Sequence, residues 1–346
     1  MKSNPIISVS QRQAGERVHG GPDETGVPAY DFSTNSNACG PCPSAQTAVA
    51  QADASTYPDA SYNQLRQQLA DFHAVPVRRV VLAASASEFI FRVTAMAARR
   101  GVSAVWLPPH SYGDYAHAAR AHQLPVRADA AGCSLYWSCE PSSPLGDAHE
   151  GLSALVDGAA DKSAPGLVVL DRAYEPLRLS GALALNDAQL QKVWQLWTPN
   201  KALGLTGVRA AYAIAPQGAD VDIEAMSQLC PSWPVGAHGV AMLQAWTQSD
   251  TQAWLASSLD TLRDWKSKQM AMCDSLGWTV LPSHANFFVS HTGLEPAVLA
   301  DLRGHGIKLR DCASFGLPGH MRLSVQPPAA QNALKSAWLR VTQGSA

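Results

Sequence analysis

The sequence predicts an α/β protein with a large domain, in which helices sandwich a mainly parallel sheet, and a smaller C-terminal α+β domain. With 346 residues, 46% of them hydrophobic, the chain can bury a large core and divide into two domains. Up to "CPSWPVG" (230–236), apolar runs of strand length alternate with helical stretches. At that segment two prolines and a glycine break the chain, and the alternation then weakens.

Four apolar runs predict the sheet of the large domain. They are "RVVLAA" (79–84), "SAVWLP" (103–108), "GLVVLD" (166–171) and "RAAYAIA" (209–215). Runs that are apolar on both faces are typical of parallel strands covered by helices. Helical stretches such as "EFIFRVTAMAARR" (88–100) separate them.

The C-terminal part predicts a long helix followed by strands. Apolar residues near helical spacing (Leu255, Leu259, Leu262, Trp265) precede the strand-like segments "NFFVS" (286–290) and "HMRLSVQ" (320–326). We expect an N-terminal arm (1–35) that packs with the small domain and the substrate pocket, a large cofactor domain (36–235) and a small domain (236–346).

Charge and cysteine usage exclude several classes of function. The formal net charge is −2, from 26 basic and 28 acidic residues without a run of one sign, so we expect neither a nucleic-acid partner nor a membrane partner. No apolar run approaches the roughly 18 residues that a membrane span needs. Seven dispersed cysteines in a chain of this size fit a reducing compartment, which favours a soluble, cytoplasmic protein. No metal site is predicted.

The segment "NSNACGPCPS" (35–44) places Cys39 and Cys42 in a C-G-P-C frame, the spacing of a dithiol oxidoreductase. Such a site needs a buried strand before the motif and a helix start after it, because the helix terminus lowers the pKa of the thiol. The preceding "DFSTNSNA" is polar and turn-like. We therefore interpret the two cysteines as part of a Gly-Pro turn, with the redox enzyme as an alternative.

A lysine, an acid and an arginine in one order predict a pyridoxal-phosphate site. Asp171 ends the strand "VVLD", Tyr174 follows three residues later, and Lys201 precedes Arg209 by eight residues. The cofactor requires an amine to hold its aldehyde as a Schiff base, a carboxylate to keep its ring nitrogen protonated, and a cation for its phosphate. Each residue alone has a simpler interpretation, a helix cap for Asp171 or a surface amine for Lys201, but together they answer the demands of one cofactor.

The sequence resembles the fold-type I pyridoxal-phosphate enzymes of the aminotransferase class I/II superfamily. It is closest to the branch that holds histidinol-phosphate aminotransferases and the threonine-phosphate decarboxylases of cobalamin synthesis. The resemblance extends over nearly the whole chain and rests on "KALGLTGVR", "DRAY" and "STYPDASYNQLRQQLADFH". It implies a pyridoxal-phosphate fold of type I, an aminotransferase and a homodimer in which Tyr57 reaches the cofactor phosphate of the other subunit. "DFSTNSNACGPCP" aligns with the segment that closes the substrate pocket in this family.

The resemblance also assigns the remaining cofactor contacts. It implies that Ala86 and Ser87 in "ASASEFI" meet the phosphate at a helix start, where free N–H groups favour an anion. Thr198 and Asn200, just before the lysine, join this set, and Tyr112 in "PPHSYGDY" would stack on the ring. One position departs from the family: Ser143 in "EPSSPLG" replaces an asparagine that normally bonds the cofactor's O3′. A serine is shorter, so a water would have to bridge the gap.

Substrate residues follow from the same likeness. Arg322 in "FGLPGHMRLSVQ" would hold an α-carboxylate through a bidentate pair. The segments "VHGGPDETGVPAYDFSTNSN" and "IKLRDCASF" look closer to the decarboxylases, which implies that His19, Asn35 and Arg310 bind a substrate phosphate or second anion. The lysine segment has the aminotransferase form. Transamination of an amino acid or amino-phosphate is thus the first expectation, threonine-phosphate decarboxylation the second, and a silent relative that only binds the cofactor a third.

Overall fold

A seven-stranded sheet organises the larger part of the protein. The computed structural model describes residues 19–160 and 166–343, and it orders these strands β2-β8-β7-β6-β5-β3-β4. Neighbouring strands are parallel except at β8, which is antiparallel to β2 and β7. The strands are β2 Val80–Ala83, β3 Val105–Trp106, β4 Val126–Arg127, β5 Leu135–Cys139, β6 Leu167–Asp171, β7 Trp194–Trp197 and β8 Ala211–Ile214.

The predicted α/β class and the mainly parallel sheet are confirmed. The four predicted runs form β2, β3, β6 and β8. The sequence analysis missed two buried strands at the centre of the sheet, β5 ("LYWSC") and β7 ("WQLW"). Ser138 and Gln195 interrupt their apolar character, although both side chains are buried, so neither segment reads as a continuous apolar run.

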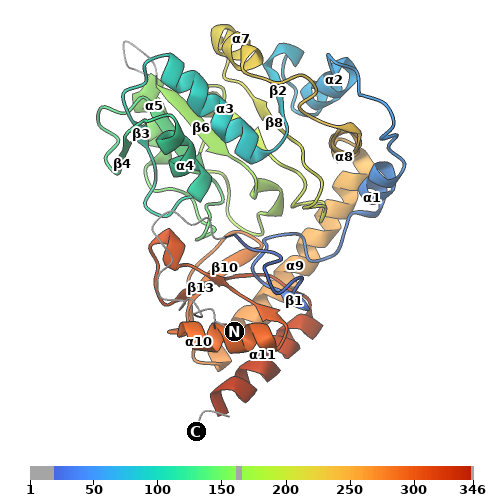
Figure 1. Cartoon of the computed structure of the whole chain (residues 1–346), viewed down its shortest axis with the longest axis vertical. Helices are drawn as coiled ribbons and strands as arrows, with labels where there is room; N and C mark the ends of the chain where they lie inside the picture. Colours follow the sequence, from blue (N-terminus) through green and yellow to red (C-terminus); the bar gives the residue numbers. More distant parts are fainter. Residues whose placement is uncertain (1–18, 161–165, 344–346) are drawn as a thin grey trace, which may run out of the picture.

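Helices cover both faces of the sheet (Figure 1). In β6, Val169 packs in one core with α3 and α4, whereas Val168 and Leu170 pack in another with α5, because successive strand residues point to opposite faces. A third core joins β2 and β8 to α2 and α8. The helices of this part are α1 Pro43–Ala50, α2 Asn63–Phe72, α3 Ala86–Arg99, α4 Gly113–Ala121, α5 Leu152–Ala160, α6 Asp187–Leu190, α7 Asp220–Gln228 and α8 Ala237–Trp246.

A second, smaller body is built on an antiparallel sheet of order β12-β13-β10-β9 (Figure 1). Its strands are β9 Thr279–Val280, β10 Phe287–His291, β12 Arg310–Asp311 and β13 His320–Ser324, and its helices are α10 Pro296–Gly304 and α11 Pro328–Gln343. Strand β1 (Tyr30–Asp31) of the N-terminal segment pairs with β11 (Ile307–Lys308) beside it. The described end of the N-terminal arm is therefore fastened to the small body, while residues 1–18 of that arm lie outside the described residues.

Helix α9 (Ser249–Ser275) connects the two bodies. Leu255 and Leu262 pack in the core around β2 and β8, and Cys273 packs in the core of the small body with Phe288 and Leu323. Helix α8, just before it, packs with α2 in the large body. The division at residues 35 and 235 remains a prediction.

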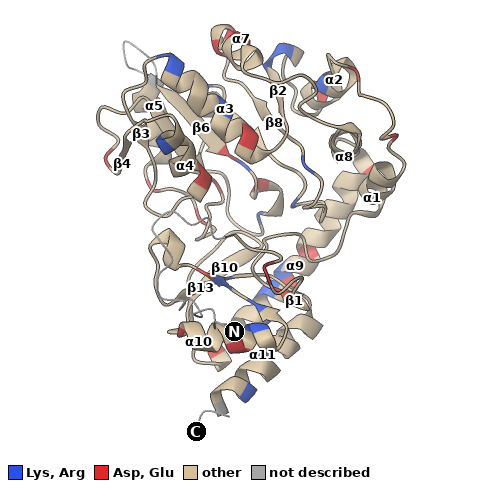
Figure 2. Ribbon diagram, in the orientation of Figure 1, with Lys and Arg blue, Asp and Glu red and all other residues tan. Residues whose placement is uncertain are grey.

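Charged side chains are dispersed over both bodies (Figure 2). In the part of the chain that the structure describes, no helix combines the length and the apolar character that a membrane span requires.

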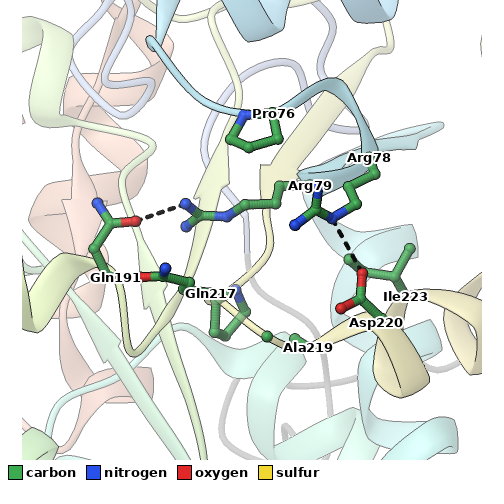
Figure 3. Close-up of a pocket in the computed structure, with 10 residues that line it drawn as sticks. Pro76, Arg78, Arg79, Gln191, Gln217, Ala219, Asp220 and Ile223 are labelled. Atoms are coloured by element: carbon green, nitrogen blue, oxygen red, sulfur yellow. Dashed lines mark hydrogen bonds and ion pairs between the residues drawn. The ribbon is translucent and has the colours of Figure 1, made fainter.

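The start of β2 is fastened to the strand beside it (Figure 3). The turn η1 (Val77–Arg79) leads into the strand, and the Arg79 guanidinium donates from Nε to the Ala215 carbonyl at 2.7 Å and from Nη1 to the Gln191 side chain at 2.6 Å. Arg79 thus joins the end of β8 and the end of α6 to the edge of the sheet.

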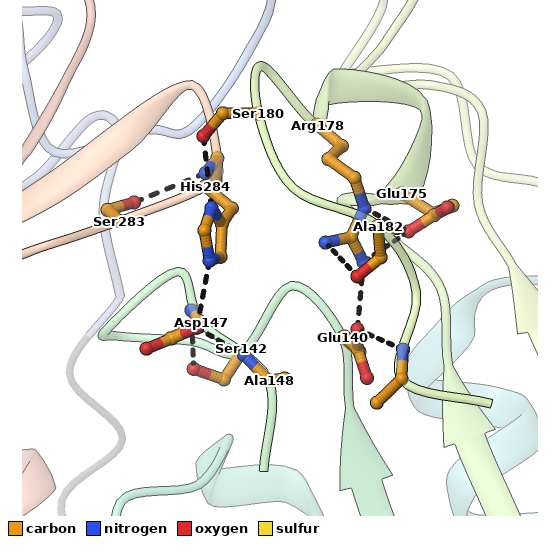
Figure 4. A network of polar contacts seen from close by, with 12 residues as sticks. Glu140, Ser142, Asp147, Ala148, Glu175, Arg178, Ser180, Ala182, Ser283 and His284 are labelled. Atoms are coloured by element: carbon orange, nitrogen blue, oxygen red, sulfur yellow. Dashed lines mark hydrogen bonds and ion pairs between the residues drawn. The ribbon is translucent and has the colours of Figure 1, made fainter.

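A polar network joins the loop after β5 to the segment that precedes β10 (Figure 4). Glu140, fully buried, accepts from Arg178 at 3.1 Å and from the Ala184 amide at 2.9 Å, and Glu175 pairs with the same arginine. His284 reaches back to this loop, since its amide donates to the Gly146 carbonyl and its ring pairs with Asp147. The contacts of His284 therefore hold the small body against the large one, whereas the pair of Glu140 with Arg178 braces the large body from within.

We predict that Glu140→Ala lowers the free energy of unfolding by about 3 kcal/mol, because Arg178 and the Ala184 amide lose a buried partner. Because Glu175 still pairs with the Arg178 guanidinium, the expected loss of stability is at the low end of the range for breaking a buried ion pair. Asp147→Ala is the matched control: its pair with His284 is about half exposed, so its loss should cost less than about 1 kcal/mol. Urea unfolding of the cofactor-free variants measures both. Equal losses would show that the burial of Glu140 does not matter.

Candidate active site

Asp171 is the buried acid at the end of the central strand β6. Its Oδ1 accepts from the Ala173 amide at 2.9 Å, and its Oδ2 accepts from the Tyr115 hydroxyl at 2.7 Å. Burial raises the pKa of Asp171, because removal from water disfavours the charged form. No hydrogen bond or ion pair links the carboxylate to a cationic side chain in the described chain. The charge of Lys201 acts on the carboxylate without a direct contact and offsets only part of the effect of burial on its pKa.

Two tyrosines lie beside this acid. Tyr112 precedes α4, and its hydroxyl bonds Asp114 at 2.9 Å and approaches the Ser87 hydroxyl at 3.5 Å. Tyr115 meets Tyr112 edge-on and stacks on Trp137 with ring centroids 4.4 Å apart. The aromatic wall thus connects the acid of β6 to the start of α3.

The start of α3 has the form of an anion site. The Ser85 side chain caps the helix by accepting from the Glu88 amide at 3.1 Å. The amides of Ala86 and Ser87, at the first two helical positions, have no acceptor within the helix, and the helix dipole adds partial positive charge there. A phosphate would satisfy these donors.

Lys201 follows β7 in a tight loop. Its Nζ lies 5.4 Å from the centre of the Tyr174 ring and, among the described residues, makes neither a hydrogen bond nor an ion pair. Thr198 donates to Asn200 at 2.8 Å, and Asn200 donates weakly to the Thr206 and Val208 carbonyls. All polar atoms of the Asn200 amide are therefore engaged in shaping the loop that presents the lysine.

The C-G-P-C turn packs on this lysine loop. Cys42 donates its amide to the Leu203 carbonyl at 2.8 Å, and all seven cysteines are free thiols. Gly204 adopts φ +68°, and a Cβ there would lie 2.6 Å from the Gly40 carbonyl oxygen, so the two turns need a glycine at their contact. A backbone contact accounts for this segment without redox chemistry.

Arg322 belongs to strand β13 of the small body. Its guanidinium lies 5.6 Å from the Phe287 ring, which contacts the Tyr174 ring beside Lys201. Arg322 is buried and donates to the Ser143 hydroxyl at 3.0 Å and to the Ser33 carbonyl at 2.9 Å, and no described residue bonds its Nε. Ser143, the departure from the family asparagine, is thus a direct partner of the predicted substrate arginine. Within the described part of the chain, the buried amide of Asn35 has no hydrogen-bond partner for its oxygen or its nitrogen.

Arg310 lies directly across from Arg322 in the β12–β13 pair. It is buried, donates to the Ser314 hydroxyl at 2.8 Å, and both guanidinium groups face the Phe315 ring, at 4.8 Å for Arg310 and 5.8 Å for Arg322. Burial and the charge of Arg322 lower the pKa of Arg310 to about 10. Two arginines are thus gathered on one wall.

Three predicted residues lie at the periphery. His19 is exposed, with its ring centre 6.3 Å from that of Tyr112. Tyr57 is 77% exposed and stacks on Trp233. Arg209 is exposed beside a cavity lined also by Gly207 and His238. Of these, only His19 contacts another predicted site residue.

The sequence analysis missed Tyr115, Ser33 and Phe315. Tyr115 carried a usable signal, because it stands only three residues after Tyr112, in the first turn of the helix that Tyr112 precedes. Ser33 takes part through its backbone carbonyl and Phe315 through its ring, and neither contact has a signature in the sequence.

The arrangement fits pyridoxal 5′-phosphate. Asp171 is a buried carboxylate that a protonated ring nitrogen would compensate, Lys201 is an unpaired amine nearby, and the start of α3 offers unsatisfied donors for a phosphate. The unpartnered atoms of Asn35 and Arg322 leave polar groups for a substrate. The fold and this site define the class: a pyridoxal-phosphate-dependent enzyme of fold type I.

The chain belongs to the aminotransferase class I and II family, whose model matches residues 27–336. A similar relative is the histidinol-phosphate aminotransferase of Halorubrum lacusprofundi, 29% identical over 316 residues, which are 85% of this chain and 83% of the relative. This membership confirms the predicted enzyme class, a pyridoxal-phosphate-dependent aminotransferase.

Solved structures show the same fold. The histidinol-phosphate aminotransferase from Sinorhizobium meliloti, in complex with pyridoxal-5'-phosphate, matches with a TM-score of 0.76 and 21% identity over 92% of each chain. The L-threonine-O-3-phosphate decarboxylase from Porphyromonas gingivalis matches with a TM-score of 0.75 and 18% identity over 90% of this chain and 99% of that one.

We predict that Asp171→Asn separates cofactor binding from folding. The variant keeps the shape of the side chain but lacks the charge, so the cofactor-free protein should be at least as stable as the wild type. The direction of this stability change follows from the raised pKa. Asp171 binds its proton more tightly in the folded chain than in the unfolded chain, so its ionised form lowers the stability at neutral pH. Cofactor affinity should fall at least about tenfold and activity about 100- to 1,000-fold.

Thermal unfolding of the cofactor-free protein and absorbance titration with pyridoxal phosphate measure the two effects. A variant destabilised by more than about 1 kcal/mol, with cofactor affinity unchanged, would show that Asp171 serves the fold.

Proposed function

We propose that this enzyme transfers the amino group of an amino-acid-like substrate that carries a second anionic group, such as a phosphate. The observation that carries this proposal is the pair of buried arginines, Arg310 and Arg322, opposite each other in the small body. Two buried cations on one wall repel each other, and a substrate with two anionic groups relieves that repulsion when it binds. The histidinol-phosphate aminotransferase relatives are consistent with such a substrate.

The two arginines would divide the substrate between them. Arg322 would hold the α-carboxylate, because its free Nε and the neighbouring Asn35 amide offer donors that nothing in the described chain engages. Arg310, with the Ser314 hydroxyl, would hold the second anion. His19, near Tyr112, would approach the same end from the N-terminal arm.

The remaining residues would hold the cofactor. Lys201 would bind its aldehyde, Asp171 its ring nitrogen, and Ala86, Ser87, Thr198 and Arg209 its phosphate, with Tyr112 against the ring. Tyr174, whose ring adjoins Lys201, would bond O3′, and Asn200 would shape the lysine loop. When bound, the cofactor supplies an electron-withdrawing ring that weakens one bond to the substrate Cα.

The side chains then decide which bond reacts. Arg322, fixed by Ser143 and Ser33, would hold the carboxylate in place, so that the Cα–H bond is the one exposed to Lys201. Lys201 would act as the general base that takes this proton and as the acid that returns it to the cofactor. Ser143 is shorter than asparagine, so its direct bond to Arg322 favours orientation of the arginine as its main role.

Decarboxylation of an amino-acid phosphate is the second candidate. His19 beside Tyr112 and the unpartnered Asn35 amide are the residues that the sequence links to threonine-phosphate decarboxylases. The same pocket would perform this reaction if the carboxylate, rather than the proton, stood across the plane of the ring.

Absorbance of the purified, cofactor-loaded enzyme distinguishes the two reactions. Histidinol phosphate, O-phosphothreonine and glutamate are added one at a time, without a keto acid. A true amino donor should leave the cofactor permanently in its amine form, and Arg322→Met should raise the half-saturating concentration of that donor about 100-fold through loss of a buried charge pair.

If O-phosphothreonine releases carbon dioxide and the spectrum afterwards returns to its starting form, the enzyme is a decarboxylase and the proposed transamination is wrong. Lys201→Ala is the control: it should lose the chromophore in either case. A wild-type protein without that chromophore, even with added cofactor, would overturn both assignments.

We further propose that two copies share their active sites in the cytoplasm, where seven free thiols would persist. Tyr57 supports the dimer, because its ring is stacked on Trp233 yet 77% exposed and makes no contact with the site of its own chain. An exposed aromatic pair of this kind suits a subunit interface.

Mixing two inactive variants tests the sharing. If Tyr57 serves the partner's site, Lys201→Ala and Tyr57→Ala subunits should form hybrid dimers with one intact site each. Random mixing makes half of the dimers hybrid, so we expect about a quarter of wild-type activity after the subunits exchange. A mixture no more active than the separate variants would contradict the shared site, while sedimentation of each variant controls for loss of the dimer.

A further inference from the structure

Arg79 is a buried arginine outside the candidate active site. It directly precedes β2, whereas the candidate anion-binding turn at Ser85 follows the other end of that strand, so the two lie at opposite ends of one strand. Its exposed fraction is only 6%. Its position therefore has no part in the chemistry proposed above.

The charge of Arg79 has no anionic partner among the described residues. Its Nε and Nη1 donate to the Ala215 carbonyl and the Gln191 amide, which are both neutral, and its Nη2 has no partner. Buried charges in proteins are normally paired, because an isolated ion loses its hydration without compensation. Burial, aided by the charge of Arg78, lowers the pKa of Arg79.

Other buried arginines show what this absence means. Arg92 is paired with Glu88 at 2.9 Å. Arg322, which has only neutral partners, lies where we propose a substrate carboxylate. Arg79 resembles Arg322 and not Arg92, which suggests that an external anion completes its environment.

A cavity of about 140 Å³ adjoins the Arg79 side chain (Figure 3). The start of α7 forms the opposite wall, and its N-cap, Ala219, has no side chain that could satisfy the free amides of the first turn. Arg78 stands at the rim, where it pairs with Asp220, and both side chains are about two-thirds exposed. The carboxylate of Asp220 is thus directed to the exposed arginine and leaves the buried one uncompensated.

We propose that this cavity is a second binding site, for inorganic phosphate or the phosphate group of a small metabolite. Arg79 supplies the buried charge, and the helix start supplies backbone donors. A volume of this size is large enough for a tetrahedral oxyanion. The site is independent of the proposed substrate, because no residue is common to both.

The test is a thermal-shift titration of the cofactor-loaded Arg310→Met protein with inorganic phosphate. In this background the bound cofactor occupies the start of α3, and the arginine that we propose for a substrate phosphate is absent, so neither site responds. We expect a saturable rise in melting temperature that potassium chloride at equal ionic strength does not reproduce. Glycerol 3-phosphate in a parallel titration distinguishes the sources: tighter binding than phosphate assigns the site to a phosphomonoester, weaker binding to the free ion.

Two further variants in the same background locate the response. Arg79→Met should raise the apparent dissociation constant for phosphate at least tenfold. Gln191→Glu, which is isosteric, places a carboxylate on the Nη1 of Arg79, so it should both remove the phosphate response and raise the melting temperature without phosphate. Gln191→Glu keeps the proposal testable if Arg79→Met fails to fold.

Arg100→Gln is the matched control. Arg100, at the end of α3, pairs with Asp222 of α7, the helix that also carries Asp220, but it does not line the cavity. The variant should leave the phosphate response unchanged. No saturable response in the parent protein, or an unchanged response in Gln191→Glu, would overturn the proposal.

Discussion

The burial of a carboxylate at the end of strand β6 is the constraint on which the active-site structure depends. Asp171 is held in one orientation by the Tyr115 hydroxyl and the Ala173 amide, and it is excluded from water. An ion in such a position raises the free energy of the folded chain unless a cation is close. In the proposed function this cost is offset when the cofactor binds, because its protonated ring nitrogen would meet an acid that is already oriented.

The second requirement is that the large and the small body bring their residues together at one site. Strand ends of the large body deliver Asp171 and Lys201, whereas the antiparallel sheet of the small body delivers Arg322. The bodies are joined by the apolar contacts of α9 and by His284, which bonds the Gly146 carbonyl and pairs with Asp147. Ser143, in the same loop as Gly146 and Asp147, adds a direct hydrogen bond to Arg322 of the small body.

The sequence was informative where chemistry or periodicity is local. Lys201, Asp171 and Tyr174 could be predicted as site residues because a cofactor imposes an order of residue types along the chain. Strands β2, β3, β6 and β8 appeared as continuous apolar runs, but β5 and β7 did not, since a buried serine or glutamine breaks the run while its neighbours in space satisfy it. Tyr115 was missed because its hydrogen bond joins residues 56 positions apart.

By itself, the sequence determined the fold class through its apolar runs, and the family and cofactor through the resemblance of its motifs to known enzymes; it also predicted Lys201 as the reactive lysine. Only the tertiary structure decided that the C-G-P-C turn braces the lysine loop, that Ser143 contacts Arg322, that Arg310 and Arg322 share one wall, and that Arg79 is buried without an anion. These are relations between segments far apart along the chain. Distance, burial and the sign of a neighbouring charge arise only when folding brings such segments together.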